Sequence, residues 1–208
     1  MKELAIKLKL IDFLVKNSSN ELILGSEVRF NFGSRRADIV SLEEKIATVY
    51  EIKSAGDSIE RLANQIDNYK EYFDYCYIVC VDENISSVRK KISKSIGIIK
   101  VSESSVIFIR KARKFIQHSK ISLSSTLPLK LLKKKSINKN IKSKFELCLD
   151  ISKRHKTDEI RLISREKLKE SLENRYSLFL SEVGEIITPD DMLTLTRMPS
   201  GRISRLPQ

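Results

Sequence analysis

Cysteine and histidine are scarce in this 208-residue chain, and long apolar runs are absent. The three cysteines form no Cys-x-x-Cys pair, which argues against a disulfide framework or a zinc site. Cys76 and Cys80 lie four apart in an expected strand, so we interpret them as small buried core residues. No stretch approaches the roughly 20 apolar residues of a membrane span. We therefore expect no membrane partner and a cytoplasmic protein.

The N-terminus superficially resembles a signal peptide, but charged residues interrupt its apolar stretch, at Lys7, Lys9, Asp12 and Lys16. Its apolar residues recur at helical spacing instead, at Leu4, Leu8, Ile11, Leu14 and Val15. This pattern predicts an amphipathic helix over residues 2–16. With 41% hydrophobic and 32% charged residues, the chain is typical of a folded globular protein.

Positive charge is concentrated in the second half of the chain. The net charge is +12, yet residues 1–110 hold 17 basic and 16 acidic residues, whereas residues 111–208 hold 22 and 11. A basic region favours a polyanionic partner, most often a nucleic acid. AT-rich genomes also favour lysine, isoleucine, serine and asparagine, all abundant here. Charge alone therefore does not establish nucleic-acid binding.

The first half of the chain alternates expected strands and helices. Residues 27–32 have period-two alternation, and residues 37–42 and 46–53 form two β-rich runs around a short polar link, which predicts an antiparallel hairpin. Asp57 followed by Glu60 resembles a capping box before an apolar helical stripe. A buried strand follows at 75–81, then a short helix and two more strands. The predicted fold class is α/β, with a mixed sheet flanked by helices.

The second half divides into two expected regions after a core at residues 1–112. Residues 113–140 are interpreted as a basic linker with a short helix after Pro128, and residues 141–208 as a helical C-terminal region. Residues 157–176 also fit a helix-turn-helix weakly. The basic clusters carry no interleaved aromatics, so they match no DNA-reading motif; they are Lys130, Lys133, Lys134 and Lys135, and Arg197, Arg202 and Arg205.

Two acidic residues and a lysine stand out within the predicted hairpin. Glu51 and Lys53 share one side of their strand because side chains alternate, and the hairpin brings Asp38 opposite residues 49–51. Two neighbouring carboxylates repel each other unless a cation lies between them. A magnesium site would remove that cost, and the lysine would then activate water or stabilise charge. The pattern therefore favours metal-dependent phosphodiester hydrolysis, although an incidental edge-strand pattern is the alternative.

The segments RRADIV, YEIKS and ERLANQIDNY resemble the PD-(D/E)XK nuclease superfamily across residues 1–82. More narrowly, they are similar to small bacterial and phage proteins of poorly known function and to MmcB-type DNA-repair proteins. The resemblance implies a restriction-endonuclease-like core of order α-β-β-β-α-β. The proline of the superfamily's name is Ala37 here, a position that tolerates many residues.

The resemblance also implies roles for individual residues. Asp38 and Glu51 would ligate Mg²⁺ or Mn²⁺ with the Ile52 carbonyl, and Lys53 would be the catalytic lysine. Glu27 matches an upstream acidic residue that would bind the metal or orient its water, with Glu3 as the alternative. The remaining candidates would contact the lysine, a water or a phosphate: Gln65 and Tyr69.

The leading hypothesis is a Mg²⁺- or Mn²⁺-dependent endonuclease that acts on DNA in repair, phage biology or defence. Candidate phosphate contacts, for which solvated surface charge is the alternative, are Arg35, Arg36, Arg61, Lys133, Lys134 and Lys135. RNA as a substrate and a homodimer both stay open. The alternatives are a non-catalytic nucleic-acid-binding module and a protein-interaction module on the same fold.

Overall fold

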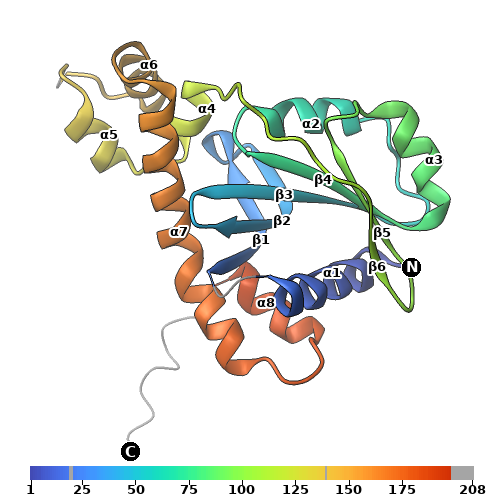
Figure 1. Cartoon of the computed structure of the whole chain (residues 1–208). Helices are drawn as coiled ribbons and strands as arrows, with labels where there is room; N and C mark the ends of the chain where they lie inside the picture. The colour runs from blue at the N-terminus through green and yellow to red at the C-terminus, as the bar shows by residue number, and fades with distance from the viewer. Residues whose placement is uncertain (19–20, 139, 198–208) are drawn as a thin grey trace, which may run out of the picture.

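A single six-stranded sheet organises the protein. The computed structural model describes residues 1–18, 21–138 and 140–197 (Figure 1). The strands lie in chain order across the sheet: β1 (Leu22–Phe30), β2 (Arg35–Glu43), β3 (Ile46–Lys53), β4 (Tyr75–Cys80), β5 (Gly97–Val101) and β6 (Val106–Arg110). The β3–β4 and β4–β5 pairs are parallel and the others antiparallel. The expected mixed sheet is confirmed.

Helices cover both faces of the sheet, and the apolar core consists of two clusters, one on each face. They are α1 (Glu3–Asn17), α2 (Leu62–Lys70), α3 (Asp82–Lys91), α4 (Lys120–Ser125), α5 (Leu129–Lys135), α6 (Lys144–Arg154), α7 (Thr157–Glu182) and α8 (Pro189–Thr196). On one face, α2 to α7 contribute to a cluster with buried residues such as Val40, Val49 and Ile66. On the other face, α1, α8 and the end of α7 cover Leu24, Ile39 and others (Figure 1).

Several local predictions about the first half need correction. The strand expected at 27–32 begins earlier, at Leu22, and ends before a 3-10 turn at Asn31–Gly33 (η1). On α1, the predicted stripe is confirmed at Ile11 and Leu14, which are buried, but Leu4 is exposed and Ile6 and Leu10 are buried in addition. The capping box at Asp57 was wrong, because α2 begins at Leu62 and the Asp57 carboxylate instead accepts hydrogen bonds from Ser54.

The helix-turn-helix interpretation was also wrong. Residues 157–176 lie within α7, one continuous 26-residue helix with Leu168, Leu172 and Phe179 on its buried face. Thr188 and Asp191 form a capping box at the start of α8, in the region expected to be helical. All three cysteines are buried and free, which confirms the interpretation of Cys76 and Cys80 as core residues. No helix among the described residues has the length and apolarity to cross a membrane.

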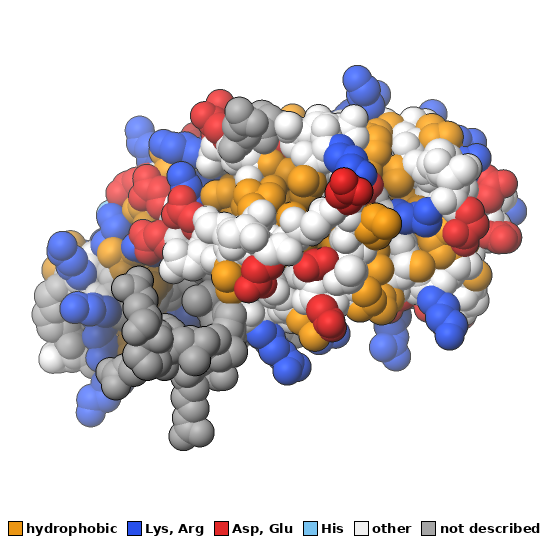
Figure 2. All heavy atoms as spheres, turned by 90° about the horizontal axis from the view of Figure 1, so that it is seen from below, with side chains coloured by type: hydrophobic (Ala, Val, Ile, Leu, Met, Phe, Trp, Pro, Cys, Tyr) orange, Lys and Arg blue, Asp and Glu red, His pale blue; other side chains and the backbone are white. Residues whose placement is uncertain are grey.

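The segment interpreted as a linker packs against the sheet. Residues 113–140 hold α4 and α5, and Leu123, Leu127 and Leu132 are buried in the cluster that also contains α2 and the sheet. The Ser119 side chain caps α4 by accepting a hydrogen bond from the Ser122 N–H. This packing brings the basic α5 and α6 to one end of the molecule, where Lys and Arg side chains gather on the face in Figure 2.

A buried ion pair ties α7 to the sheet. Arg165 on α7 donates from Nε to Asp74, just before β4, over 3.1 Å, and both side chains are fully buried. Asp74 also accepts a hydrogen bond from the Ala47 N–H over 2.9 Å. The Arg165 guanidinium further donates to the Tyr72 carbonyl and lies over the Tyr72 ring. The long helix and the hairpin are therefore joined through one carboxylate.

Candidate active site

Three acidic residues lie in one row across neighbouring strands. The β1–β2 register pairs Ser26 with Ile39 and Val28 with Ala37, which sets Glu27 opposite Asp38. The β2–β3 pairing ends at Ile39 and Tyr50, one position before Asp38 and Glu51 would meet. The predicted hairpin register is thus observed, and the two strands separate at the acidic residues.

Asp38 takes over a backbone hydrogen bond where the hairpin opens. Its Oδ2 accepts from the Ile52 N–H over 2.8 Å, in place of a backbone carbonyl of β2. The N–H and C=O of a strand residue point toward the same neighbouring strand. The Ile52 carbonyl therefore faces the same gap as the Asp38 carboxylate. This arrangement follows from strand geometry and brings an acceptor, as predicted for Ile52, to the acidic row.

Glu27 adopts an unusual backbone conformation at this place. Its φ is +56°, in the left-handed region that costs a non-glycine residue about 1–3 kcal/mol. Leu24 and Val28 would share a face in a regular strand, yet they lie in opposite apolar clusters. Side-chain direction therefore reverses at Glu27. Such strain persists where the surroundings fix it, and it often marks a functional site.

Glu51 is the centre of a buried hydrogen-bonded group. Its Oε1 accepts from Lys53 Nζ over 2.8 Å and from Gln65 Nε2 over 2.6 Å, and its Oε2 accepts from the Tyr69 hydroxyl. Lys53 also donates to Gln65 Oε1 over 3.2 Å. Gln65 and Tyr69 meet the same carboxylate because residues four apart share a helix face. The structure thus brings together four of the residues singled out from sequence.

Lys7 is a site residue that the sequence analysis missed. Its ammonium lies 2.6 Å from Glu3, 2.7 Å from Glu27 and 3.9 Å from Asp38, and the residue is only 4% exposed. Burial lowers its pKa, but hydrogen bonds to Glu27 and Glu3 and the Asp38 charge outweigh burial, so the pKa is raised. The available signal was Glu3 and Lys7 at helical spacing; Lys7 was interpreted only as a charge interrupting an apolar stretch.

Both candidates for the upstream acidic residue lie in this cluster. Oxygens of Glu3, Glu27 and Asp38 all fall within 4.8 Å of one another, the single such acidic group among the described residues. Glu27 is closer in character to a site residue because its side chain is 20% exposed, against 52% for Glu3. Both candidates are therefore present in the cluster, and Glu27 is the better enclosed of the two.

The electrostatics of Asp38 are those of a carboxylate without enough positive charge nearby. Burial raises its pKa, and the Glu51 carboxylate raises it further, to about 7, despite the Ile52 N–H and Lys7. Burial and the Glu51 charge likewise raise the pKa of Tyr69, which keeps its hydroxyl protonated as a donor. The acidic row therefore carries a cost that a nearby cation would reduce.

The donor set fits a hard divalent cation. It consists of carboxylate oxygens and a carbonyl, the ligands that Mg²⁺ and Mn²⁺ prefer. Glu27 Oε2 is buried without an aligned hydrogen bond, although Arg36 Nε lies 2.6 Å away as an ion pair. Asp38 Oδ1 has Lys7 only at 3.9 Å. Asp38 and Glu27 therefore each have a carboxylate oxygen with spare acceptor capacity.

A basic hollow opens beside this site. It is lined by Arg35, Arg36, Arg61, Gln65 and Asn68 together with Asp38 and Glu51. The three predicted arginines therefore line the same hollow as Asp38 and Glu51. Tyr69 is buried, and its hydroxyl is engaged by Glu51, so it is a support for that carboxylate. The predicted lysines on α5 do not line this hollow: Lys133, Lys134 and Lys135.

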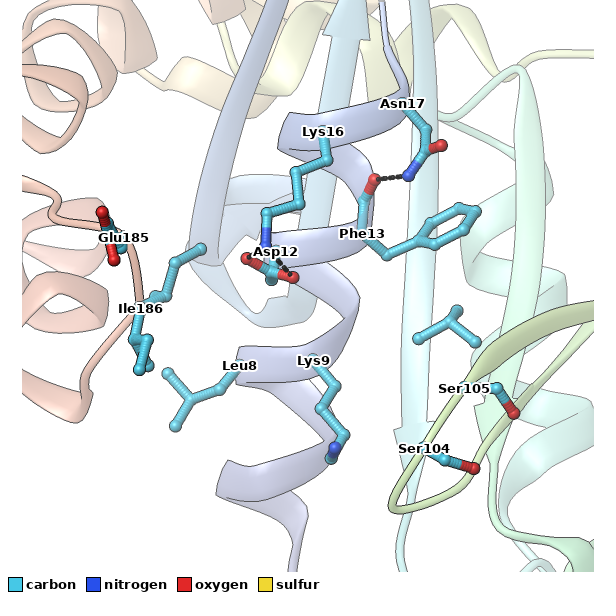
Figure 3. A pocket seen from close by; sticks show the side chains of 12 residues that line it. Leu8, Lys9, Asp12, Phe13, Lys16, Asn17, Ser104, Ser105, Glu185 and Ile186 are labelled. Carbon is cyan, nitrogen blue, oxygen red and sulfur yellow. Dashed lines mark hydrogen bonds and ion pairs between the residues drawn. The ribbon is translucent and has the colours of Figure 1, made fainter.

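A more apolar hollow lies elsewhere, between α1, the β5–β6 turn and the segment before α8 (Figure 3). Three of the four charged side chains in its lining have local partners, because Lys16 pairs with Asp12 over 2.7 Å and Lys9 donates to the Glu103 carbonyl. It also lacks the converging carboxylates of the hairpin. We therefore place the candidate chemistry at Asp38 and Glu51.

Comparisons with known proteins point to a phage family. The family described as bacteriophage P4 protein cII matches residues 1–196. Protein cII of Enterobacteria phage P4 is 34% identical over 119 residues, a match of 54% of this chain but only 44% of that relative. A solved protein of unknown function from Silicibacter pomeroyi covers 56% of this chain, with 76% of its own length matched, a TM-score of 0.44 and 14% identity.

Proposed function

We propose that this chain, which belongs to the bacteriophage P4 protein cII family, is a metal-dependent nuclease with a restriction-endonuclease-like core. One observation carries the proposal: Asp38, Glu51 and Lys53 converge where the β2–β3 hairpin opens, with Gln65 of the following helix bonded to two of them. The element order from α1 to β4 is α-β-β-β-α-β, which supports the same fold assignment.

Each residue has a role that follows from its contacts. Asp38 and Glu51 would hold Mg²⁺ or Mn²⁺ with the Ile52 carbonyl, and Glu27 would bind the metal or orient its water. A divalent cation bound there polarises a phosphodiester and lowers the pKa of water. Lys53, kept in place by Glu51 and Gln65, would orient the attacking water or offset charge on the phosphate.

The buried hydrogen-bonded group also explains how the lysine is prepared. A buried ammonium needs partners, and Lys53 has Glu51 Oε1 and Gln65 Oε1 within 3.2 Å. Its third donor position remains for a substrate oxygen or water. The guanidinium groups of Arg35 and Arg61 border the same hollow and suit phosphate oxygens. DNA is therefore the substrate we favour, with RNA left open.

The test combines metal binding with cleavage. We expect Mn²⁺ to bind the wild type in calorimetry, and to support cleavage of single-stranded, duplex or branched DNA. Asp38→Ala should lose binding, and both Asp38→Ala and Lys53→Met should lose about a hundredfold or more in rate. Glu44→Gln, an exposed change in the turn of the same hairpin, is the matched control. Wild type that neither binds Mn²⁺ nor cuts any of these substrates would overturn the proposal.

One observation favours a second candidate function, a nucleic-acid-binding module without turnover. Lys7 already neutralises Glu3 and Glu27 from within the chain, as a resident cation would. In that case the wild type binds DNA with strong salt dependence and ignores Mn²⁺, whereas Lys7→Met gains Mn²⁺ affinity. Metal binding by the wild type, abolished in Asp38→Ala, contradicts this alternative.

A further inference from the structure

A strained turn beside the candidate site holds an aromatic ring outward. In η1, Asn31 has φ +47° and Phe32 has φ +57°, two successive non-glycine residues in the left-handed region. Hydrogen bonds fix the turn: the Phe32 N–H donates to Ser125 Oγ over 3.2 Å, and Arg29 donates to the Gly33 carbonyl over 3.0 Å. The neighbouring Phe30 is 1% exposed, whereas Phe32 is 39% exposed.

A second exposed ring from the other half of the chain meets the first. Phe145, in the first turn of α6, is 51% exposed, and its ring centroid lies 5.9 Å from that of Phe32. Two phenylalanines in contact would normally bury their faces in the core, where their transfer from water is most favourable. These two instead form a pair at the surface, which leaves apolar ring area available to a flat partner.

The hollow beside Phe32 has basic side chains and no acidic ones in its lining. The hollow between η1, α4, α6 and α7 is lined by Arg29, Lys144 and Lys167, by hydroxyl side chains including Ser125 and Thr126, and by no aspartate or glutamate. Lys167 is paired with Glu170 outside the lining, whereas Lys144 has no ion pair with the described residues. The charge of this hollow is complementary to phosphate.

The hollow of Arg29, Lys144 and Lys167 is adjacent to the hollow of the candidate active site. Both are lined by Phe30, and they lie on the two sides of the same turn, with Gly33 lining one and Ser34 the other. A chain of phosphates that followed the basic side chains past the turn would reach Arg35 and then Asp38 and Glu51. The rings of Phe32 and Phe145 would contact its bases along the way.

We propose that the Phe32–Phe145 pair and the hollow of Arg29, Lys144 and Lys167 bind single-stranded nucleic acid and lead it toward Asp38 and Glu51. Unpaired bases stack on aromatic rings, whereas the bases of a duplex have no free faces, and a basic groove follows the phosphates. The proposal deepens the proposed function by naming its substrate class, and it rests on that function only for the last step, cleavage.

Binding is measured by fluorescence anisotropy in EDTA, so that cleavage plays no part. The probes are a labelled single-stranded DNA, the RNA of the same sequence, and a hairpin duplex. Phe32→Leu and Phe145→Leu keep apolar bulk and remove the flat ring; each should weaken single-strand binding about 5- to 150-fold. Phe108→Leu is the matched control, because Phe108 is 40% exposed on β6, away from the hollow.

The salt dependence of binding tests the contribution of charge separately from that of the rings. Lys144→Ala should reduce the slope of log affinity against log salt by about 0.7, the value for one phosphate contact on a single strand. Glu44→Gln, in the exposed turn of the hairpin, should bind the probes as the wild type does. Ring variants that bind like Phe108→Leu, a wild type that binds only the duplex, or no binding at low salt would each overturn the proposal.

The two proposals fail in different ways. If the ring variants lose single-strand affinity but the wild type cuts nothing with Mn²⁺, the binding site stands and the nuclease proposal fails. If the wild type cuts with Mn²⁺ and the ring variants cut and bind equally well, the nuclease proposal stands and this inference fails. A loss of DNA and RNA affinity alike assigns the site to single strands in general, and a loss of only one names the preferred strand.

Discussion

Arg165→Met tests whether the two halves of the chain are one folding unit. Arg165 and Asp74 are fully buried, and they join α7 to the residue that precedes β4. Methionine fills a similar volume without charge or donors. The substitution therefore leaves the Asp74 carboxylate buried with fewer partners, and it also leaves the Tyr72 carbonyl without its donor.

The expected cost can be worked from the contacts that remain. Breaking a buried ion pair by removing one partner costs about 3–5 kcal/mol, chiefly because the remaining charge is left uncompensated. Asp74 keeps the Ala47 N–H at 2.9 Å and Arg161 at 3.4 Å, so we expect the lower end, about 3 kcal/mol. For a domain of this size, that corresponds to a fall in Tm of about 6–12 °C.

Urea unfolding followed by circular dichroism and tyrosine fluorescence measures the effect. We expect one transition for the wild type in both signals, and one at lower urea for Arg165→Met. Adding Asp74→Asn removes the uncompensated charge while its carbonyl still accepts from Ala47, so the double variant should recover part of the loss. A cost below about 1 kcal/mol, or two separate transitions in the wild type, would refute the reasoning.

Three further predictions concern single side chains. Asp38→Asn should stabilise the metal-free protein by about 1–2 kcal/mol near neutral pH, since burial and Glu51 raise the pKa of Asp38 to about 7; an unchanged urea midpoint in EDTA would contradict this. His118→Gln should reduce the loss of stability on going from neutral pH to about pH 5. Burial lowers the pKa of His118 below its ordinary 6.5 despite Asp74, so the unfolded chain binds the proton first and stability falls as pH drops below that value; equal losses in both proteins would argue against it. Thr188→Ala should cost about 1 kcal/mol by removing the cap of α8, seen as a lower Tm, whereas Thr194→Ala inside the helix should cost less.

Local patterns predicted the hairpin and much of the acidic row. Two β-rich runs and the short polar link between them predicted how β2 and β3 pair, and that register brings Asp38 beside Glu51. The start of α2 was mispredicted because Asp57 and Glu60 have the spacing of a capping box. The Asp57 carboxylate instead accepts a hydrogen bond from the Ser54 N–H in a turn. Gln65 was still identified correctly as a contact of Lys53, because the family resemblance pointed to it and did not depend on where the helix begins.

The contacts that the sequence could not reveal are those made between distant segments. The position of Lys7 depends on how α1 crosses the sheet, where it contacts β3, β5 and β6, and the apolar stripe predicted for α1 was only partly right. The pairing of Phe32 with Phe145 and of Asp74 with Arg165 joins the two halves of the chain. No local sequence pattern predicts either pair, because the two residues of each pair lie far apart in the chain.

The position of Lys7 has a consequence for how the site would work. A buried ammonium beside Glu3, Glu27 and Asp38 lowers the repulsion among them, and so it stabilises the metal-free protein. The same charge repels a divalent cation that approaches Asp38. In the proposed nuclease, metal affinity would then be weak until a phosphodiester supplied further oxygen ligands and negative charge. A nuclease built this way would bind magnesium chiefly together with its substrate, so magnesium titrated alone is a poor test of function, and manganese calorimetry beside a cleavage assay is the better one.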